Sequence, residues 1–214
     1  MMMRRMLLVV MFATIAAGWG ASPMSAAALP APCAVTEDAG SATPAATTDA
    51  AAADAATATA PAAAELPAWM TMELKAACDG ATFTLADFAG KTVYVQAFAT
   101  TCGNCRAQLA NVFEAQPELG EDVVVVVLSI DTQVSDEALV AYAEKHGYPF
   151  IYAAMSEEML RALGEEFGRE VAIAPQRPHF FLAPNGAHTE LRTGEEKGEA
   201  LVTAIAEFAA ANAA

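Results

Sequence analysis

Runs of apolar residues predict buried strands in the second half of the chain. Residues 92–98 (TVYVQAF) are apolar and rich in β-formers, which favours a buried strand. The unbroken β-branched run within 121–131 is typical of a strand covered on both faces, as in a parallel α/β sheet. Residues 148–152 predict a further strand, and residues 187–193 predict a last, antiparallel one. We therefore expect a mixed central sheet.

Helical patterns separate these strands. The segment after residue 98 carries apolar residues at helical spacing and predicts a helix that begins at or near Cys102. Residues 135–146 open with Ser-Asp-Glu and end at His-Gly, which are the start and stop signals of a capped helix. Residues 156–167 predict another helix, and a terminal helix is expected from Gly194 onward. Strands and helices thus alternate in α/β order.

The folded domain is expected to span residues 66–214. At its start, two strand-like runs, 72–78 and 81–85, flank Asp79-Gly80, which is a hairpin signal. The strand and helix within 148–167 then form an additional unit between the core strands.

The first 28 residues have the composition of a signal peptide. Arginines at positions 4 and 5 precede a short apolar run at 6–17, and alanines at 26–28 offer a cleavage site. The apolar run is short for a membrane span. We expect an exported protein of the cell envelope, secreted or tethered to the membrane by its N-terminus, with an uncleaved anchor as the second choice.

Residues 29–65 are rich in alanine, threonine and proline and predict a disordered linker. This segment contains Cys33, directly after Pro32. Three roles remain open for Cys33: lipidation, which the preceding proline disfavours, a free thiol, or a disulfide with Cys78. Cys78 is either that partner or a small buried apolar residue.

The most informative stretch places Cys102 and Cys105 in the first turn of a helix that leaves a strand. Unpaired N–H groups and the positive end of the helix dipole favour a thiolate there, so cysteine pKa values fall below about 8.5. Cys102 would attack a disulfide, and Cys105 would resolve the mixed disulfide. The alternatives are a structural disulfide and half of a zinc site, but the chain has no second CxxC and no paired histidines.

Residues 98–109 (FATTCGNCRAQL) resemble the FWATWCxxC motif of the thioredoxin superfamily, in particular the TlpA/ResA-type extracytoplasmic thiol–disulfide oxidoreductases. The resemblance runs from about Leu66 to the C-terminus. It implies a three-layer α/β/α sandwich with a mixed central sheet, an N-terminal hairpin and a strand–helix insert. It also implies an enzyme that uses Cys102 and Cys105 as its redox pair, without a cofactor.

Several residues depart from the family pattern and are candidates for tuning the pair. Thr101 stands where the family usually has tryptophan, and Gln96 stands where thioredoxin has a buried carboxylate. The dipeptide Gly103-Asn104 between the cysteines helps to set the redox poise.

Residues 174–186 resemble the cis-proline strand of the same family, which implies that Pro178 is a cis-proline facing the cysteine pair. Arg177 stands where the family often has threonine. It would favour the thiolate, bind an acidic partner, or be a solvated loop charge. His179 would tune Cys102, act in proton transfer, or be an ordinary residue at the start of a strand.

The remaining composition excludes other classes of function. A net charge of −15 offers no cationic face to nucleic acid. No metal-ligand cluster, phosphate loop or catalytic serine–histidine pair is present in the sequence, so no metal is expected. The expected partners are exported protein thiols or disulfides and an upstream membrane electron donor or acceptor, and the protein is expected to be a monomer.

The resemblance favours a reductant, for example in cytochrome c maturation. One alternative is a disulfide-forming oxidant. Another is a Sco-like copper-binding protein, although that family typically has CxxxC rather than the two-residue gap found here. A peroxiredoxin needs threonine three residues before its reactive cysteine, and this chain has Ala99 there.

Overall fold

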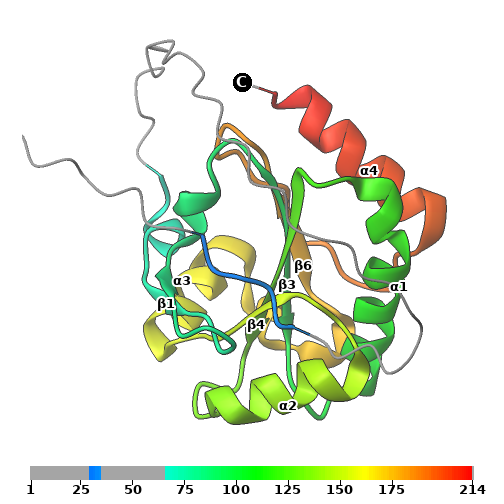
Figure 1. The fold of residues 1–214 in the computed structure, drawn as a ribbon. Coiled ribbons are helices and arrows are strands. Elements are labelled where there is room, and N and C mark those ends of the chain that lie inside the picture. The colour runs from blue at the N-terminus through cyan, green and yellow to red at the C-terminus, as the bar shows by residue number, and fades with distance from the viewer. Residues whose placement is uncertain (1–28, 35–65, 214) are drawn as a thin grey trace, which may run out of the picture.

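A computed structural model describes residues 29–34 and 66–213, and its centre is a four-stranded sheet in the order β5-β4-β3-β6 (Figure 1). The strands are β3 (Thr92–Phe98), β4 (Val123–Ser129), β5 (Ile151–Ala154) and β6 (His179–Leu182). Strand β4 is parallel to both β3 and β5, whereas β6 is antiparallel to β3. The mixed sheet predicted from the sequence is confirmed.

Helices cover both faces of this sheet. The helices are α1 (Gly103–Leu119), α2 (Asp136–His146), α3 (Glu157–Phe167) and α4 (Gly198–Ala211). Helices α1, α2 and α4 pack on one face, and α3 packs on the other together with the N-terminal elements (Figure 1). Successive side chains of a strand point to opposite faces, so Val93 and Val95 of β3 join the α3 side while Tyr94 and Phe98 join the α1 side. The three-layer sandwich is therefore confirmed.

Short elements complete the domain around the sheet. They are the 3-10 helices η1 (Ala68–Met70), η2 (Leu85–Phe88), η3 (Arg169–Ala172) and η4 (Ala174–Gln176), and the strands β1 (Leu74–Lys75) and β2 (Thr82–Phe83). Strands β1 and β2 pair antiparallel around Asp79-Gly80. Gly80 has a φ of +73°, a left-handed conformation that glycine adopts without strain. The predicted hairpin is confirmed, with shorter strands than expected.

The start of the expected linker is packed on the domain, so the prediction of disorder is wrong for residues 29–34. Cys33 is 2% exposed, forms a disulfide with Cys78, and donates its backbone N–H to the carbonyl of Phe150 at 3.0 Å. The backbone N–H of Ala31 donates to Asp79 at 2.7 Å. A covalent bond and two hydrogen bonds fix a segment whose composition alone would not order it. Among the roles open for the two cysteines, the structure shows the disulfide.

The C-terminal part also differs from the prediction. Residues 187–193 do not form a continuous strand; they meet β6 at two isolated antiparallel bridges, His179–Arg192 and Leu182–His188. Helix α4 begins at Gly198 rather than Gly194, because the backbone of Glu196 is held in a loop by hydrogen bonds to a side chain of α1.

The predicted signal peptide (1–28) and most of the predicted linker (35–65) lie outside the described residues. Within residues 29–34 and 66–213, no helix combines the length and the apolar character that crossing a bilayer requires.

Candidate active site

Two cysteines lie at the start of α1, directly after β3. Cys102 is the N-cap residue of the helix, and its Sγ accepts the backbone N–H of Cys105 at 3.1 Å. The sulfurs are joined in a disulfide, with the Cα atoms 5.3 Å apart. Cys102 is partly exposed, whereas Cys105 is 0% exposed. One sulfur of the pair is therefore accessible and the other is buried.

The helix N-terminus sets the electrostatics of the pair. Its unpaired N–H groups and positive dipole end favour a thiolate over a thiol at Cys102 once the disulfide is reduced. Gly103 and Asn104 between the cysteines are exposed, and a Cβ added at Gly103 would meet nothing within 4 Å. Thr101 is exposed too. Cys102 is therefore flanked in the chain by exposed, small residues.

The loop that follows η3 lies against the cysteine pair. The carbonyl oxygen of Ala174 is 3.1 Å from Sγ of Cys105, where a thiol would donate to it. Asn104 donates its side-chain amide to the carbonyl of Pro175 at 3.0 Å. Arg177 donates its Nε to the backbone carbonyl of Asn104 at 3.2 Å. The proximity of this loop to the pair, which the resemblance implied, is present in the structure.

The cis-proline expected at Pro178 is not found. No peptide bond within the described residues is cis, so the bond between Arg177 and Pro178 is trans. The chain instead turns at Arg177, which has a left-handed conformation with φ +57° and ψ +52° at the end of η4. Pro178 itself is buried, and its carbonyl accepts the N–H of Ala97 on β3 at 3.0 Å. It thereby extends the pairing of β6 with β3 toward the active site.

Gln96 connects the sheet to the redox pair. Its side chain is fully buried, donates Nε2 to the carbonyl of Cys105 at 3.2 Å, and accepts the hydroxyl of Tyr94 at 3.2 Å. Burial raises the pKa of the Tyr94 hydroxyl, so this group stays a neutral donor. The position that holds a carboxylate in thioredoxin is thus occupied here by a neutral amide with both ends paired.

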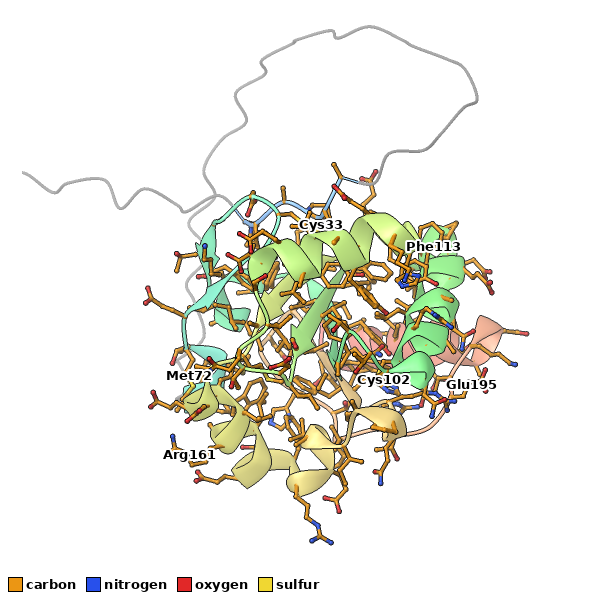
Figure 2. The ribbon with its side chains drawn as sticks, turned by 90° about the horizontal axis from the view of Figure 1, so that it is seen from below. Cys33, Met72, Cys102, Phe113, Arg161 and Glu195 are labelled. Carbon is orange, nitrogen blue, oxygen red and sulfur yellow. A yellow bond between two sulfur atoms is a disulfide. The ribbon has the colours of Figure 1, made fainter. Side chains whose placement is uncertain are left out.

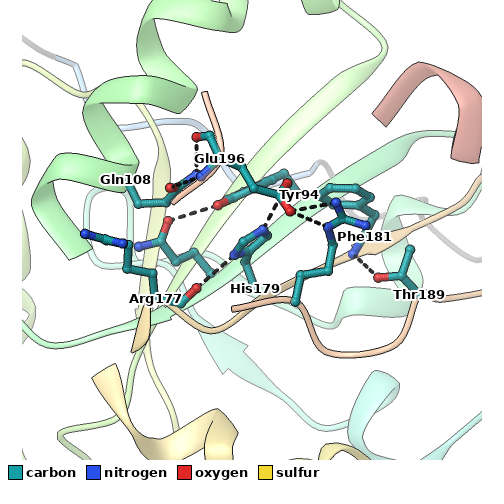
Figure 3. A network of polar contacts seen from close by, with 9 residues as sticks. Tyr94, Gln108, Arg177, His179, Phe181, Thr189 and Glu196 are labelled. Atoms are coloured by element: carbon teal, nitrogen blue, oxygen red, sulfur yellow. Dashed lines mark hydrogen bonds and ion pairs between the residues drawn. The ribbon is translucent and has the colours of Figure 1, made fainter. Parts of the chain in front are cut away.

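His179 belongs to a polar network behind the pair (Figure 3). It is 0% exposed, its Nδ1 lies 2.8 Å from the carbonyl oxygen of Arg177, and its Nε2 lies 3.4 Å from Oε2 of Glu196. Arg192 binds the other oxygen of Glu196 through Nε at 2.8 Å and Nη2 at 2.6 Å. Burial opposes ionisation of Glu196, but His179 and Arg192 outweigh it and lower the pKa of this carboxyl.

Sequence reasoning missed three members of this network, namely Gln108, Arg192 and Glu196. Gln108 is fully buried on α1, donates to the carbonyl of Glu196 at 2.9 Å and accepts its N–H at 3.0 Å. Its position offered a signal, because a glutamine three residues after Cys105 and directly before Leu109 lies on the inward face of the helix. Arg192 and Glu196 carried no comparable signal.

Comparisons with known proteins agree with this fold. A family model described as Redoxin matches residues 39–200. No curated protein sequence matches the chain. A solved thiol:disulfide interchange protein of the thioredoxin family from Chlorobium tepidum is 19% identical, with 69% of this chain and 99% of that one covered and a TM-score of 0.55.

Two further solved structures have similar scores. A putative electron transfer protein from Aquifex aeolicus is 16% identical, with coverages of 67% and 92% and a TM-score of 0.56. A secreted disulfide oxidoreductase from Mycobacterium tuberculosis, homologous to E. coli DsbE, is 15% identical, with coverages of 65% and 97% and a TM-score of 0.50. These structural similarities establish the thioredoxin-like fold.

Proposed function

The chain belongs to the Redoxin family, and from this premise we propose that it exchanges disulfides with exported proteins through Cys102 and Cys105. Both the family and the presence of a CxxC pair in a thioredoxin fold indicate thiol–disulfide oxidoreductase activity. The assignment of Cys102 and Cys105 rests on one observation. A partly exposed sulfur lies at a helix N-terminus and is bonded to a buried sulfur one turn further along the helix.

We propose a two-step exchange in which the protein acts as reductant, and the accessible and buried sulfurs support the two-step course. In the reduced protein, the Cys102 thiolate attacks one sulfur of a substrate disulfide, and the other substrate sulfur leaves as a thiolate that takes up a proton. Cys105 then loses its proton and attacks Sγ of Cys102, which expels the second substrate sulfur. The substrate gains two electrons and becomes a dithiol, and Cys102–Cys105 becomes a disulfide. An upstream membrane electron donor would restore the dithiol.

The setting proposed for this reaction is outside the cytoplasm. The signal-like composition of residues 1–28 supports export, as does the second disulfide, Cys33–Cys78, because such bonds persist in oxidising compartments. Resemblance to the TlpA/ResA type supports the reducing direction, and a disulfide between apocytochrome c cysteines is one candidate substrate. The protein would act as a monomer.

The contacts of His179 favour disulfide exchange over copper binding. A Sco-like carrier would need a histidine nitrogen free to join the two sulfurs. Both ring nitrogens of His179 are instead directed at other groups, the carbonyl of Arg177 and the carboxylate of Glu196.

Trapping of mixed disulfides tests the proposed roles. We expect a Cys105→Ser variant of the full chain to capture exported proteins through Cys102, because the resolving thiol is gone. The matched Cys102→Ser variant should capture none, since Cys105 is buried. Equal capture by both variants would contradict the assignment of attacker and resolver.

The direction of electron flow needs a separate measurement. The reduction potential of the pair should lie near that of thioredoxins, about −270 mV, for a reductant, and a value near about −120 mV would identify an oxidant.

A further inference from the structure

His179 faces two acceptors and has no exposed surface. Its Nδ1 is 2.8 Å from the carbonyl oxygen of Arg177, and its Nε2 is 3.4 Å from Oε2 of Glu196. Neither Nε2 nor Oε2 has a hydrogen-bonding partner in the described part of the chain, so the contact between them is their only polar one. A buried nitrogen and a buried carboxylate oxygen left in this way are costly unless they attract each other.

The hydrogen-bonding inventory decides how many protons this site holds. A carbonyl oxygen only accepts, so Nδ1 of His179 must carry a hydrogen. If Nε2 had none, its lone pair would face the lone pairs of Glu196. A second proton between these atoms removes that repulsion and produces an imidazolium–carboxylate pair. The geometry therefore fits a doubly protonated His179.

The neighbouring groups leave this charge only partly compensated. Arg192 binds the same carboxylate and lies 5.2 Å over the ring of Phe181, while Tyr94 of β3 stacks on the imidazole with ring centroids 5.3 Å apart. Gln108, which faces the site from α1, is neutral. The two cations and the single carboxylate give the cluster one net positive charge when His179 is protonated.

His179 is connected to the redox pair through the loop on which Arg177 lies. Arg177 is the non-glycine residue with positive φ within the described ranges, a conformation that costs energy and needs support. Its carbonyl is held by His179, and its N–H donates to the carbonyl of Ala174 at 2.8 Å. The carbonyl oxygen of Ala174 also lies 3.1 Å from Sγ of Cys105.

We propose that protonated His179, paired with Glu196, is a positioning residue that locks the Arg177 carbonyl and so holds the 174–178 loop against Cys105. Loss of the second proton would weaken this lock, and the exchange equilibrium of the redox pair would then depend on the charge state of His179. The link to exchange rests on the proposed function, whereas the charge state does not.

The charge state can be measured directly in the oxidised full chain. We expect long-range ¹H–¹⁵N NMR of the histidine rings to show hydrogens on both nitrogens of His179 at pH 7, and on Nδ1 alone in a Glu196→Gln variant. Glu195→Gln is the matched control, because Glu195 is the adjacent acid and is exposed. A neutral ring in the wild-type protein, with its hydrogen on either nitrogen, would overturn the proposal.

The coupling is measured as the equilibrium constant for exchange with glutathione between about pH 5.5 and 8.5. Loss of this buried ion pair should change this constant about tenfold in Glu196→Gln and His179→Gln at low pH, with a smaller difference at high pH. Glu195→Gln should follow the wild type. Identical profiles for Glu196→Gln and Glu195→Gln would overturn the proposal.

Two further outcomes, a variant that does not fold and a pair that does not exchange, can be told apart from those above. If Glu196→Gln does not fold, the ring spectrum of the wild-type protein and the profile of His179→Gln decide the question. If the wild-type pair does not exchange with glutathione at all, the proposed function fails and the proposed coupling fails with it, while the ring spectrum still reports the charge state of His179.

Discussion

Gln96 occupies a position on β3 where an unpaired polar group would be costly. Its amide joins the hydroxyl of Tyr94 to the carbonyl of Cys105, and neither the amide nor the phenol reaches water. A carboxylate in this place would need a counter-charge or a raised pKa to remain buried. An amide provides the same two contacts without a charge, so this particular link between β3 and the redox pair does not depend on pH.

Replacing Gln96 with methionine should therefore lower the stability of the oxidised protein. The volume is nearly conserved, but the buried hydroxyl of Tyr94 loses its acceptor, which costs about 1–3 kcal/mol in the free energy of unfolding. Urea denaturation measures this change. Gln133→Met, at an exposed position of the same residue type, should change it by about 0.5 kcal/mol or less. Equal stabilities of the two variants would contradict the importance of this contact.

The segment 29–34 is an additional part of the folded domain that no hydrophobic periodicity in the sequence predicts. It has no helix or strand, yet Cys33 is buried among residues of α1, α2 and β5 in the core on that side of the sheet. Its anchorage consists of the disulfide to Cys78 and the hydrogen bonds to Asp79 and Phe150. The hairpin between β1 and β2 thus has a second role, because its turn region holds the N-terminal segment.

Removing this anchorage should destabilise the fold without abolishing exchange. A disulfide that closes a loop across 45 residues restricts the unfolded chain by about 4 kcal/mol in the chain-entropy relation. We expect a Cys33→Ser/Cys78→Ser variant to lose an amount of this order in urea unfolding, with Cys102–Cys105 kept oxidised in both proteins. Mixed-disulfide trapping with Cys105→Ser should persist in this background. An unchanged unfolding free energy would show that the segment contributes nothing to stability.

The elements that the sequence predicted best are those with strong local signals. The β-branched runs of β3 and β4 and the serine cap of α2 can be read from neighbouring residues, and Ser135 accepts the expected backbone N–H. The start of α4, the packing of Cys33 and the pairing of His179 with Glu196 depend on partners far away in the chain. In the active site, the two cysteines could be predicted because their signal is local. The network around His179 could not, because its members come from distant parts of the chain.

At the scale of the whole molecule, the charge around the redox pair differs from the overall charge. The chain has 26 acidic and 11 basic residues, for a net charge of −15. Arg106 follows the second cysteine directly, and Arg177 contacts the backbone between the two cysteines. Charges beyond the Debye length of about 8 Å at physiological salt are largely screened, so the nearby arginines should govern how a charged substrate meets Cys102 at that ionic strength.

Arg177→Gln should therefore lower the exchange rate with an acidic disulfide peptide relative to an uncharged one. One unit charge at about 8 Å in water contributes about 0.5 kcal/mol without salt and about 0.2 kcal/mol at physiological salt, which corresponds to about a 1.4-fold change in that rate ratio at about 0.15 M. Arg161→Gln is the matched control, because Arg161 lies on α3 and is distant from Cys102 (Figure 2). At about 0.15 M salt only Arg177→Gln should alter the ratio, while at about 0.01 M, where the Debye length is about 30 Å, both variants should.

The uncharged peptide separates the effect of charge from that of positioning, since loss of the contact with Asn104 would slow both peptides equally. If the two variants give the same ratio at 0.15 M, overall charge rather than local charge selects the substrate.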